Sequence, residues 1–162
     1  MFARKSGLFH SLVRQRTNMI RGDFEESKIE ATISNDAQDY YLKIRELSWG
    51  GSLGDLAGHC QISVCTGELA ADLRFCFDTP ELGIFVSELQ QLYESLAGEV
   101  KLYARYEDSY ILFRAESRGH IAIEGLLRSD HNNKLEFSLR FDQTYLRPFI
   151  SNLEIMHAAT KG

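Results

Sequence analysis

The segment GHIAIEGLLRSDHNNKLEFSLRFD, residues 119–142, contains two runs in which apolar and polar residues alternate. Successive side chains of a β-strand point to opposite faces, so this alternation predicts strands with one buried face. The polar stretch SDHNN between the runs is typical of a turn, and the whole segment therefore predicts an antiparallel hairpin. His120 and Glu124 are expected on its solvent side. The predicted buried pairs are Ile121 with Phe141 and Ile123 with Leu139.

The register of the preceding strand depends on the length of the loop before His120. A two-residue loop at Arg118-Gly119 would place Glu116 opposite Ile121 and mix polar and apolar residues on one face. A three-residue loop over 117–119, with its glycine at positive φ, places Ala115 opposite Ile121 and keeps the faces separate. We therefore predict this longer loop. Further upstream, strands over 99–106 and 109–117 with a turn at Glu107-Asp108 would pair Leu102 with Phe113.

Alternation also marks strands between residues 28 and 77, on either side of the glycine-rich stretch 50–58. Half-buried antiparallel strands have this pattern. We expect a loop or bulge anchored by Trp49 in the glycine-rich stretch. The residues expected to face the core are Ile29, Ala31, Ile33, Leu42, Ile44, Cys60, Ile62, Val64, Leu69, Ala71, Leu73, Phe75 and Phe77.

Two segments, 78–98 and 142–156, instead place apolar residues three and four positions apart, which predicts amphipathic helices. Asp78 or Thr79 is expected to cap the first helix, and Gly98 is expected to end it. Pro148 is tolerated in the first turn of the second helix, where backbone N–H groups have no helical partner. The apolar residues are Leu82, Phe85, Val86, Leu89, Leu92, Tyr93 and Leu96, followed by Leu146, Phe149, Ile150 and Leu153.

Together these elements predict an α+β fold: an antiparallel sheet of about eight strands with two amphipathic helices packed on its apolar face. The 162 residues fit one domain, which we assign to residues 21–162. Residues 1–20 contain four basic residues and no acidic one, and we expect them to form a disordered extension. Met19 is an alternative candidate for the first residue. We detect no internal sequence repeat.

Charge and hydropathy disfavour several classes of function. The net charge is −5, and the four basic residues of 1–20 leave −9 on residues 21–162, which would repel nucleic-acid phosphates. A cationic protein is the partner that this charge favours. No stretch approaches the roughly 18 consecutive apolar residues of a membrane span. We therefore expect a cytoplasmic protein that binds neither nucleic acid nor membrane.

Motifs for metal, phosphate or covalent chemistry are weak. Cys60 and Cys65 beside His59 are spaced too widely for a typical zinc pair, and free thiols are favoured. The stretch 50–58 lacks the GK[ST] ending of a phosphate loop. A row of Glu116, His120 and Asp142 is compatible with a metal-dependent enzyme or a small-ligand site, and this alternative stays open. A solvated ladder of paired charges is favoured for that row.

The predicted registers also place aromatic and apolar residues among the charges of the solvent side of the C-terminal strands. Such a patch is typical of a protein-binding surface. Cover by the N-terminal strands or loops explains it equally well. The candidate partner-binding residues are Tyr103, Tyr110, Leu112, Glu116, His120, Glu124, Leu126 and Glu136.

Three segments resemble the WapI-type immunity proteins of bacterial polymorphic toxin systems: ELQQLYESLAGEVKLY (88–103), GHIAIEGLLRSD (119–130) and KLEFSLRFDQTYLRPFISNLE (134–154). The resemblance covers about residues 80–155, is weaker over 40–80 and does not reach 1–20. At Tyr40-Tyr41 the chain departs from the Asn-Trp-like pair that the family pattern leads us to expect.

The resemblance implies a small non-enzymatic cytoplasmic protein that binds and neutralises a cognate toxin domain, often a nuclease. It carries over no catalytic residue and no cofactor. The shared motifs are expected to be structural: Gly119 for a left-handed turn, Gly125 to make room for Phe137, and Asp142 with Thr144 to cap the last helix.

Overall fold

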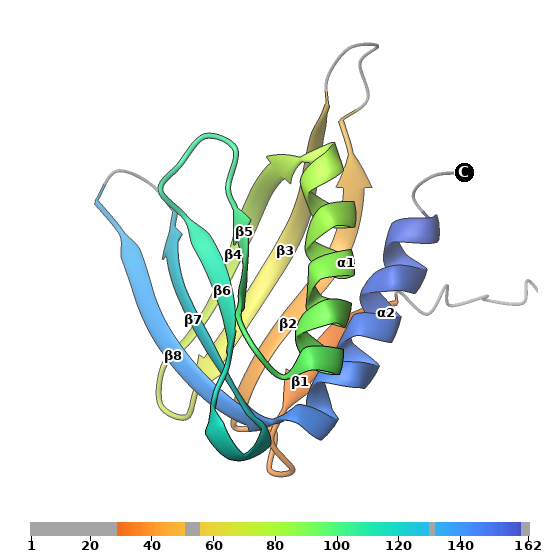
Figure 1. Cartoon of the computed structure of the whole chain (residues 1–162). Coiled ribbons are helices and arrows are strands. Elements are labelled where there is room, and N and C mark those ends of the chain that lie inside the picture. Colours follow the sequence, from red (N-terminus) through yellow and green to blue (C-terminus); the bar gives the residue numbers. More distant parts are fainter. Residues whose placement is uncertain (1–28, 51–55, 130–131, 160–162) are drawn as a thin grey trace, which may run out of the picture.

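The computed structural model of the chain describes residues 29–50, 56–129 and 132–159, which form two four-stranded antiparallel sheets and two long helices (Figure 1). Consecutive strands pair within each sheet, and one helix follows each sheet, so the same order of elements occurs twice. The elements are β1 (Ala31–Ser34), β2 (Tyr40–Trp49), β3 (Ala57–Thr66), β4 (Ala70–Asp78), α1 (Thr79–Ser95), β5 (Glu99–Tyr103), β6 (Tyr110–Ala115), β7 (His120–Arg128), β8 (Lys134–Asp142) and α2 (Leu146–Ala159).

The predicted α+β class, the eight strands and the two helices are confirmed, but the strands divide between two sheets instead of forming one. β4 runs directly into α1, which carries the chain to the first strand of the second sheet. Near this junction, the backbone amide of Arg105 donates to the carbonyl oxygen of Cys76 at 2.8 Å. The Arg105 side chain pairs with Asp78 at 3.0 Å. Both contacts are made by Arg105 in the connection between β5 and β6, so they are not part of the pairing between two strands.

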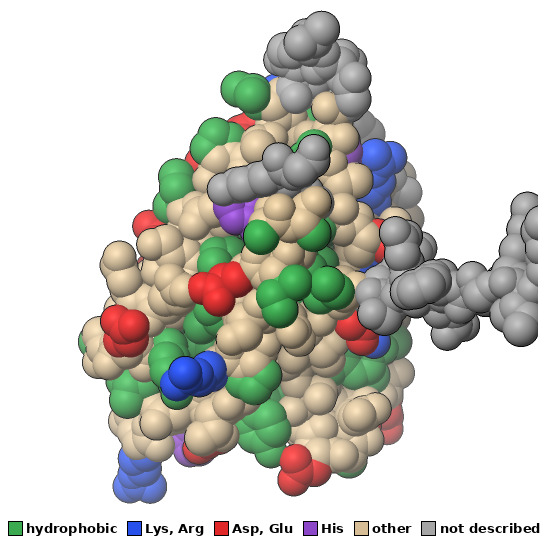
Figure 2. Space-filling view, turned by 90° about the vertical axis from the view of Figure 1, so that its right-hand side faces the viewer, with side chains coloured by type: hydrophobic (Ala, Val, Ile, Leu, Met, Phe, Trp, Pro, Cys, Tyr) green, Lys and Arg blue, Asp and Glu red, His purple; other side chains and the backbone are tan. Residues whose placement is uncertain are grey.

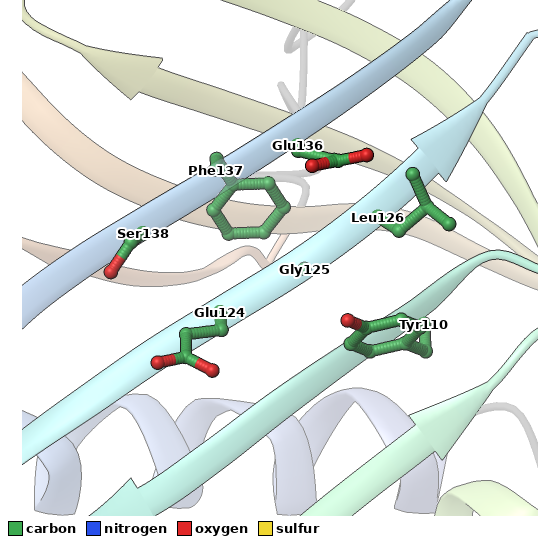
Figure 3. A pocket seen from close by; sticks show the side chains of 7 residues that line it. All are labelled: Tyr110, Glu124, Gly125, Leu126, Glu136, Phe137 and Ser138. Carbon is green, nitrogen blue, oxygen red and sulfur yellow. The ribbon is translucent and has the colours of Figure 1, made fainter.

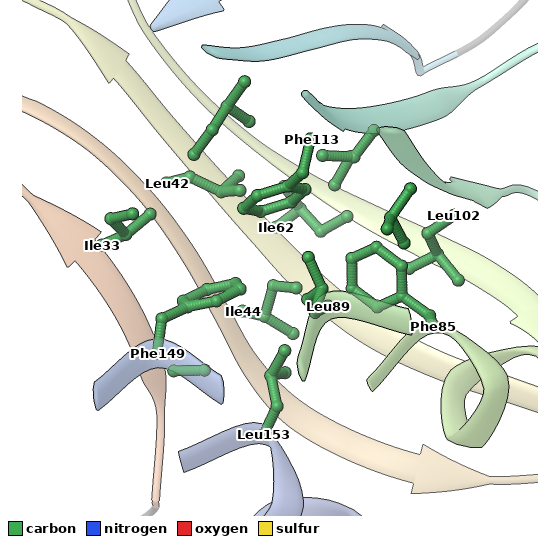
Figure 4. Packing of buried hydrophobic residues seen from close by; sticks show 14 of the residues in the cluster. Ile33, Leu42, Ile44, Ile62, Phe85, Leu89, Leu102, Phe113, Phe149 and Leu153 are labelled. Atoms are coloured by element: carbon green, nitrogen blue, oxygen red, sulfur yellow. The ribbon is translucent and has the colours of Figure 1, made fainter. Parts of the chain in front are cut away.

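The apolar faces of both sheets and both helices meet in one hydrophobic core (Figure 4). Phe113 of β6 lies at its centre and is fully buried. Its ring centroid is 5.8 Å from that of Phe85 in α1 and 5.6 Å from that of Phe149 in α2. Burial of each large apolar side chain stabilises the fold by about 1.5–3 kcal/mol. This aromatic trio therefore joins both helices to the second sheet.

Helix α1 buries the predicted stripe from Leu82 to Leu92, but its ends differ from the prediction. Asp78 occupies the N-cap position without a side-chain cap, and its carboxylate pairs with Arg105. The helix ends at Ser95, and Leu96 rather than Gly98 adopts the left-handed conformation that follows it, with φ 51°. Leu96 is consequently 40% exposed instead of buried.

The last two hairpins have the predicted registers. Ala115 pairs with Ile121, and Gly119 in the preceding three-residue loop has φ +76°. Across β7 and β8, the pairs Ile121–Phe141 and Ile123–Leu139 are both present. Asp142 accepts a hydrogen bond from the backbone amide of Thr144 at 2.9 Å and caps the short 3₁₀ turn that leads into α2.

The predicted register of β5 and β6 is wrong by two residues, because Leu102 pairs with Ile111 and not with Phe113. β5 ends at Tyr103, and the connection is longer than the predicted turn. Ser109, which is 2% exposed, ends this connection: its hydroxyl accepts a hydrogen bond from the Arg128 backbone amide at 2.9 Å. A shift of two residues preserves which face each side chain occupies, so alternation alone does not exclude it.

In the first sheet most predicted inward residues are buried, but Ile29 precedes β1 and Leu69 lies in the β3–β4 turn, and both are exposed. Residues 51–55 of the glycine-rich stretch lie outside the described residues. At its end, a Cβ atom on Gly58 would lie 2.4 Å from the ring of Phe77 and 2.6 Å from that of Trp49. Trp49 therefore packs close to Gly58, and the predicted loop over 51–55 stays a prediction.

Candidate protein-binding face

The outward side of β5–β8, which we call the exposed sheet face, carries all eight residues that the sequence predicts to bind a partner. The register arranges most of them in two neighbouring rows. The predicted pairing of Leu102 with Phe113 would place Arg105 opposite Tyr110, but in the structure Tyr103 occupies that position. The first row contains Tyr103, Tyr110, Leu126 and Glu136, and the second contains Lys101, Leu112, Glu124 and Ser138.

A lysine links the two tyrosines of the first row. The Lys101 Nζ atom is 3.8 Å from the ring centroid of Tyr110 and 4.7 Å from that of Tyr103. Tyr103 is 56% exposed, and Tyr106 in the β5–β6 connection is 72% exposed. The sequence-based set omits Lys101 and Tyr106. Lys101 could have been predicted, since it precedes Tyr103 by two residues and therefore lies on the same face of β5.

Part of the exposed sheet face is hollowed around Gly125 of β7 (Figure 3). Four of the predicted partner-binding residues border this hollow, which is shallow and open to solvent. Ser138 was not predicted as part of the site, and its short side chain leaves space beside Glu124. The residues that line the hollow are Tyr110, Glu124, Gly125, Leu126, Glu136, Phe137 and Ser138.

The three carboxylates of the predicted set are each paired with a basic residue of the same sheet. Glu124 accepts a hydrogen bond at 2.5 Å from Arg114, its diagonal neighbour on β6. Arg140 is also diagonal to Glu124, but it pairs with Glu116 at 2.8 Å. Glu136 pairs with Lys134 at 2.7 Å, and this hydrogen bond lowers the pKa of the Glu136 carboxyl.

The row proposed for metal or acid–base chemistry does not gather into a ligand set. His120 and Asp142 are opposite each other, and Glu99 at the start of β5 lies opposite Arg114 instead. The pKa of Asp142 is lowered mainly by hydrogen bonds from the Thr144 amide and hydroxyl, with a smaller contribution from the charge of His120. Within residues 29–50, 56–129 and 132–159, no three His, Cys, Asp or Glu side chains are grouped to hold a metal ion.

The cysteines are free thiols, as the sequence analysis favours. Cys60 faces the core, whereas Cys65, five residues later in the same strand, points to the opposite face. Burial, with a smaller contribution from Cys76, raises the pKa of the Cys60 thiol to about 12. The Cys60-Cys65 pair therefore does not form a zinc corner.

The side of the molecule where α2 lies has a different surface (Figure 2). Its hydrophobic side chains form separate groups among acidic, basic and other polar residues. Ile84 of α1 and Ile155 of α2 are each 50% exposed. The exposed sheet face differs because it places two tyrosines and a leucine in one row across three strands.

Comparisons with known proteins give the fold and the family. A crystal structure of MRP1/MRP2 from trypanosoma bruciei is similar in fold, with a TM-score of 0.50 and 11% sequence identity over 83% of this chain and 86% of that chain. No curated protein matches the chain. Among the described residues, neither helix is long and apolar enough to cross a membrane. The model of the WapI-like immunity protein family matches residues 21–160, and the chain therefore belongs to this family.

Proposed function

We propose that this protein binds and neutralises a nuclease-type toxin domain in the cytoplasm, and that the toxin docks on the exposed sheet face. Membership of the WapI-like family gives the chain an immunity role with a protein toxin as partner. To this role we add three proposals: the nuclease activity of the toxin, the cytoplasm as the compartment, and the exposed sheet face as the binding face. Neutralisation by binding requires no catalytic group in the immunity protein itself.

The row formed by Tyr103, Tyr110 and Leu126 favours the exposed sheet face as the docking site. Tyrosine is enriched in the residues that contribute most to binding energy at protein interfaces. Here the two tyrosines flank Lys101, and paired charges surround the row. An aromatic and apolar centre with a polar rim is the usual composition of a protein interface.

Charge supports a nuclease as the toxin. Residues 21–162 carry a net charge of −9, and proteins that bind nucleic acid commonly present basic surfaces. An acidic immunity protein would attract such a surface at long range and compete with its anionic substrate. We therefore expect complex formation to be slower at high salt.

Co-expression tests this proposal. The toxin domain encoded beside the gene is expressed in a sensitive host with the wild-type protein, Leu126→Arg or Leu69→Arg. Leu69 is 64% exposed in a turn of the first sheet and serves as the matched control. We expect protection by the wild type and Leu69→Arg, and loss of protection by Leu126→Arg when all three proteins are folded. Failure of the wild type to protect would contradict the proposed function.

A further inference from the structure

The hollow around Gly125 has the composition of a binding site for a cationic side chain. Glu124 and Glu136 occupy outward positions on adjacent strands, in a diagonal relationship across the β7–β8 pair. Diagonal Cα atoms in such a pair are about 7–8 Å apart, a span that long side chains bridge. Figure 3 shows the Glu124 and Glu136 side chains on either side of Gly125. A planar guanidinium placed between them would receive hydrogen bonds from both.

Both carboxylates retain capacity for a further donor. A carboxylate accepts about four hydrogen bonds, and the Arg114 contact uses one oxygen of Glu124. The partner of Glu136 is Lys134, two residues away on the same strand, and their side chains are 67% and 55% exposed. Exposed pairs of this kind contribute little to stability, so an incoming cation replaces Lys134 at little cost.

The other walls suit the methylene stem of the same side chain. Tyr110 and Leu126 lie side by side in the first row and border the hollow. Long basic side chains commonly pack their methylene groups on apolar surface while the charged end reaches polar partners. The hollow is too open to enclose a free small molecule, which normally buries most of its surface. A side chain presented by a protein would instead be covered by that protein.

We propose that this hollow receives one arginine side chain of the toxin, between Glu124 and Glu136 and against Tyr110 and Leu126. This inference rests on the proposed function for the identity of the partner. It adds the chemistry of the contact: a guanidinium held by two carboxylates that become desolvated when the toxin covers them.

The free protein tests the hollow without any toxin. Methylguanidinium is titrated into the ¹⁵N-labelled protein, with the neutral isostere methylurea as control. We expect amide shifts concentrated at Gly125, Leu126 and Ser138, absent with methylurea and lost in the Glu124→Gln/Glu136→Gln variant. Shifts spread evenly over the acidic surface, or shifts that persist in the double variant, would overturn the inference.

Binding to the toxin gives the second test. The Glu136→Gln change should raise the toxin Kd about tenfold or more, since it removes a charge-assisted hydrogen bond from a covered site. Glu30→Gln is the matched control, because Glu30 pairs with Lys43 at 2.9 Å outside the exposed sheet face. Normal binding by the Glu124→Gln/Glu136→Gln variant would refute the arginine site in the hollow and leave the proposed function intact. A wild-type protein that does not bind the toxin would refute the function, and the methylguanidinium titration would still decide the hollow.

Discussion

Gly125 and Phe137 face each other across β7 and β8, and a Cβ atom on Gly125 would lie 2.4 Å from the Phe137 ring. The ring occupies the space that a side chain on β7 would need. Both residues line the hollow of the exposed sheet face. The glycine is therefore a packing requirement of the sheet.

The first prediction concerns this contact. Gly125→Ala should lower the free energy of unfolding by about 1–3 kcal/mol, because the new methyl group overlaps the ring. Phe137→Leu in the same chain should restore part of the loss, which a double-mutant cycle measured by urea denaturation would show. The restoration should be incomplete, since the methyl group would also lie 2.9 Å from the Tyr110 carbonyl oxygen. An alanine variant as stable as the wild type would show that the strands move apart freely.

The loop before β7 gives a second prediction. Gly119 has φ +76°, a conformation that costs an L-residue about 1–2 kcal/mol. Gly119→Ala should lose this amount and more, because its methyl group would also lie 3.2 Å from the side-chain oxygen of Gln143. Gly98→Ala is a matched control, with φ +91° and no atom within 4 Å of the added Cβ. Equal losses for the two variants in chemical denaturation would argue against a role for the Gln143 contact.

The Asp142 cap on the 3₁₀ turn before α2 predicts a dependence of stability on pH. The Thr144 amide and hydroxyl lower the pKa of the folded Asp142 carboxyl below its ordinary value of 3.8. A depressed folded pKa adds stability that is full above pH 3.8 and is lost as the pH falls through the lowered value. Asp142→Asn should therefore be less stable than the wild type at neutral pH. The difference between the two proteins should shrink as the pH falls through the lowered pKa, and a difference that does not change with pH would refute the charged cap.

Thiol reactivity provides a fourth prediction. Burial raises the pKa of Cys60 to about 12, so little reactive thiolate forms in the folded protein. With iodoacetamide at mildly alkaline pH, Cys60 should react last of the three cysteines under native conditions. In denaturant the three should react at similar rates. Peptide mass spectrometry would detect the order, and early labelling of Cys60 would contradict its placement in the core.

Much of the fold could be predicted because alternation and loop length restrict each other in the second half of the chain. The three-residue loop at 117–119 is the one that keeps Ala115 and Ile121 on the same face, and the structure has this register. For β5 and β6, loop lengths that differ by two residues both keep the faces separate. Burial of Ser109 and its bond to Arg128 decide between them, and neither follows from periodicity.

The alternation of apolar and polar residues also could not predict the division into two sheets. Alternation identifies which residues face a core, but it does not say which strand pairs with which across a helix such as α1. The repeated order of four strands and a helix likewise has no counterpart in a sequence repeat. These features depend on contacts far apart in the chain, such as that between Arg105 and Cys76.

The sequence predicted which residues lie on the candidate face better than it predicted the rows that they form. Tyr103 and Tyr110 were assigned to the correct face but to different rows, because the row depends on the β5 register. The position of Lys101 beside both tyrosine rings follows from the observed pairing of β5 with β6. The hollow could not be predicted, since it depends on where Gly125 and Ser138 lie relative to Tyr110.

The most direct test of the account is the affinity of the purified protein for its toxin domain after removal of one tyrosine ring. Tyr103→Ala should raise the Kd about tenfold or more, as expected for an aromatic residue at the centre of an interface. Tyr40→Ala is the matched control, because Tyr40 is 45% exposed on β2 in the other sheet, and its Kd should stay at the wild-type value. Equal Kd values for wild type and Tyr103→Ala, with a weaker complex for Tyr40→Ala, would place the toxin on the first sheet and contradict the account.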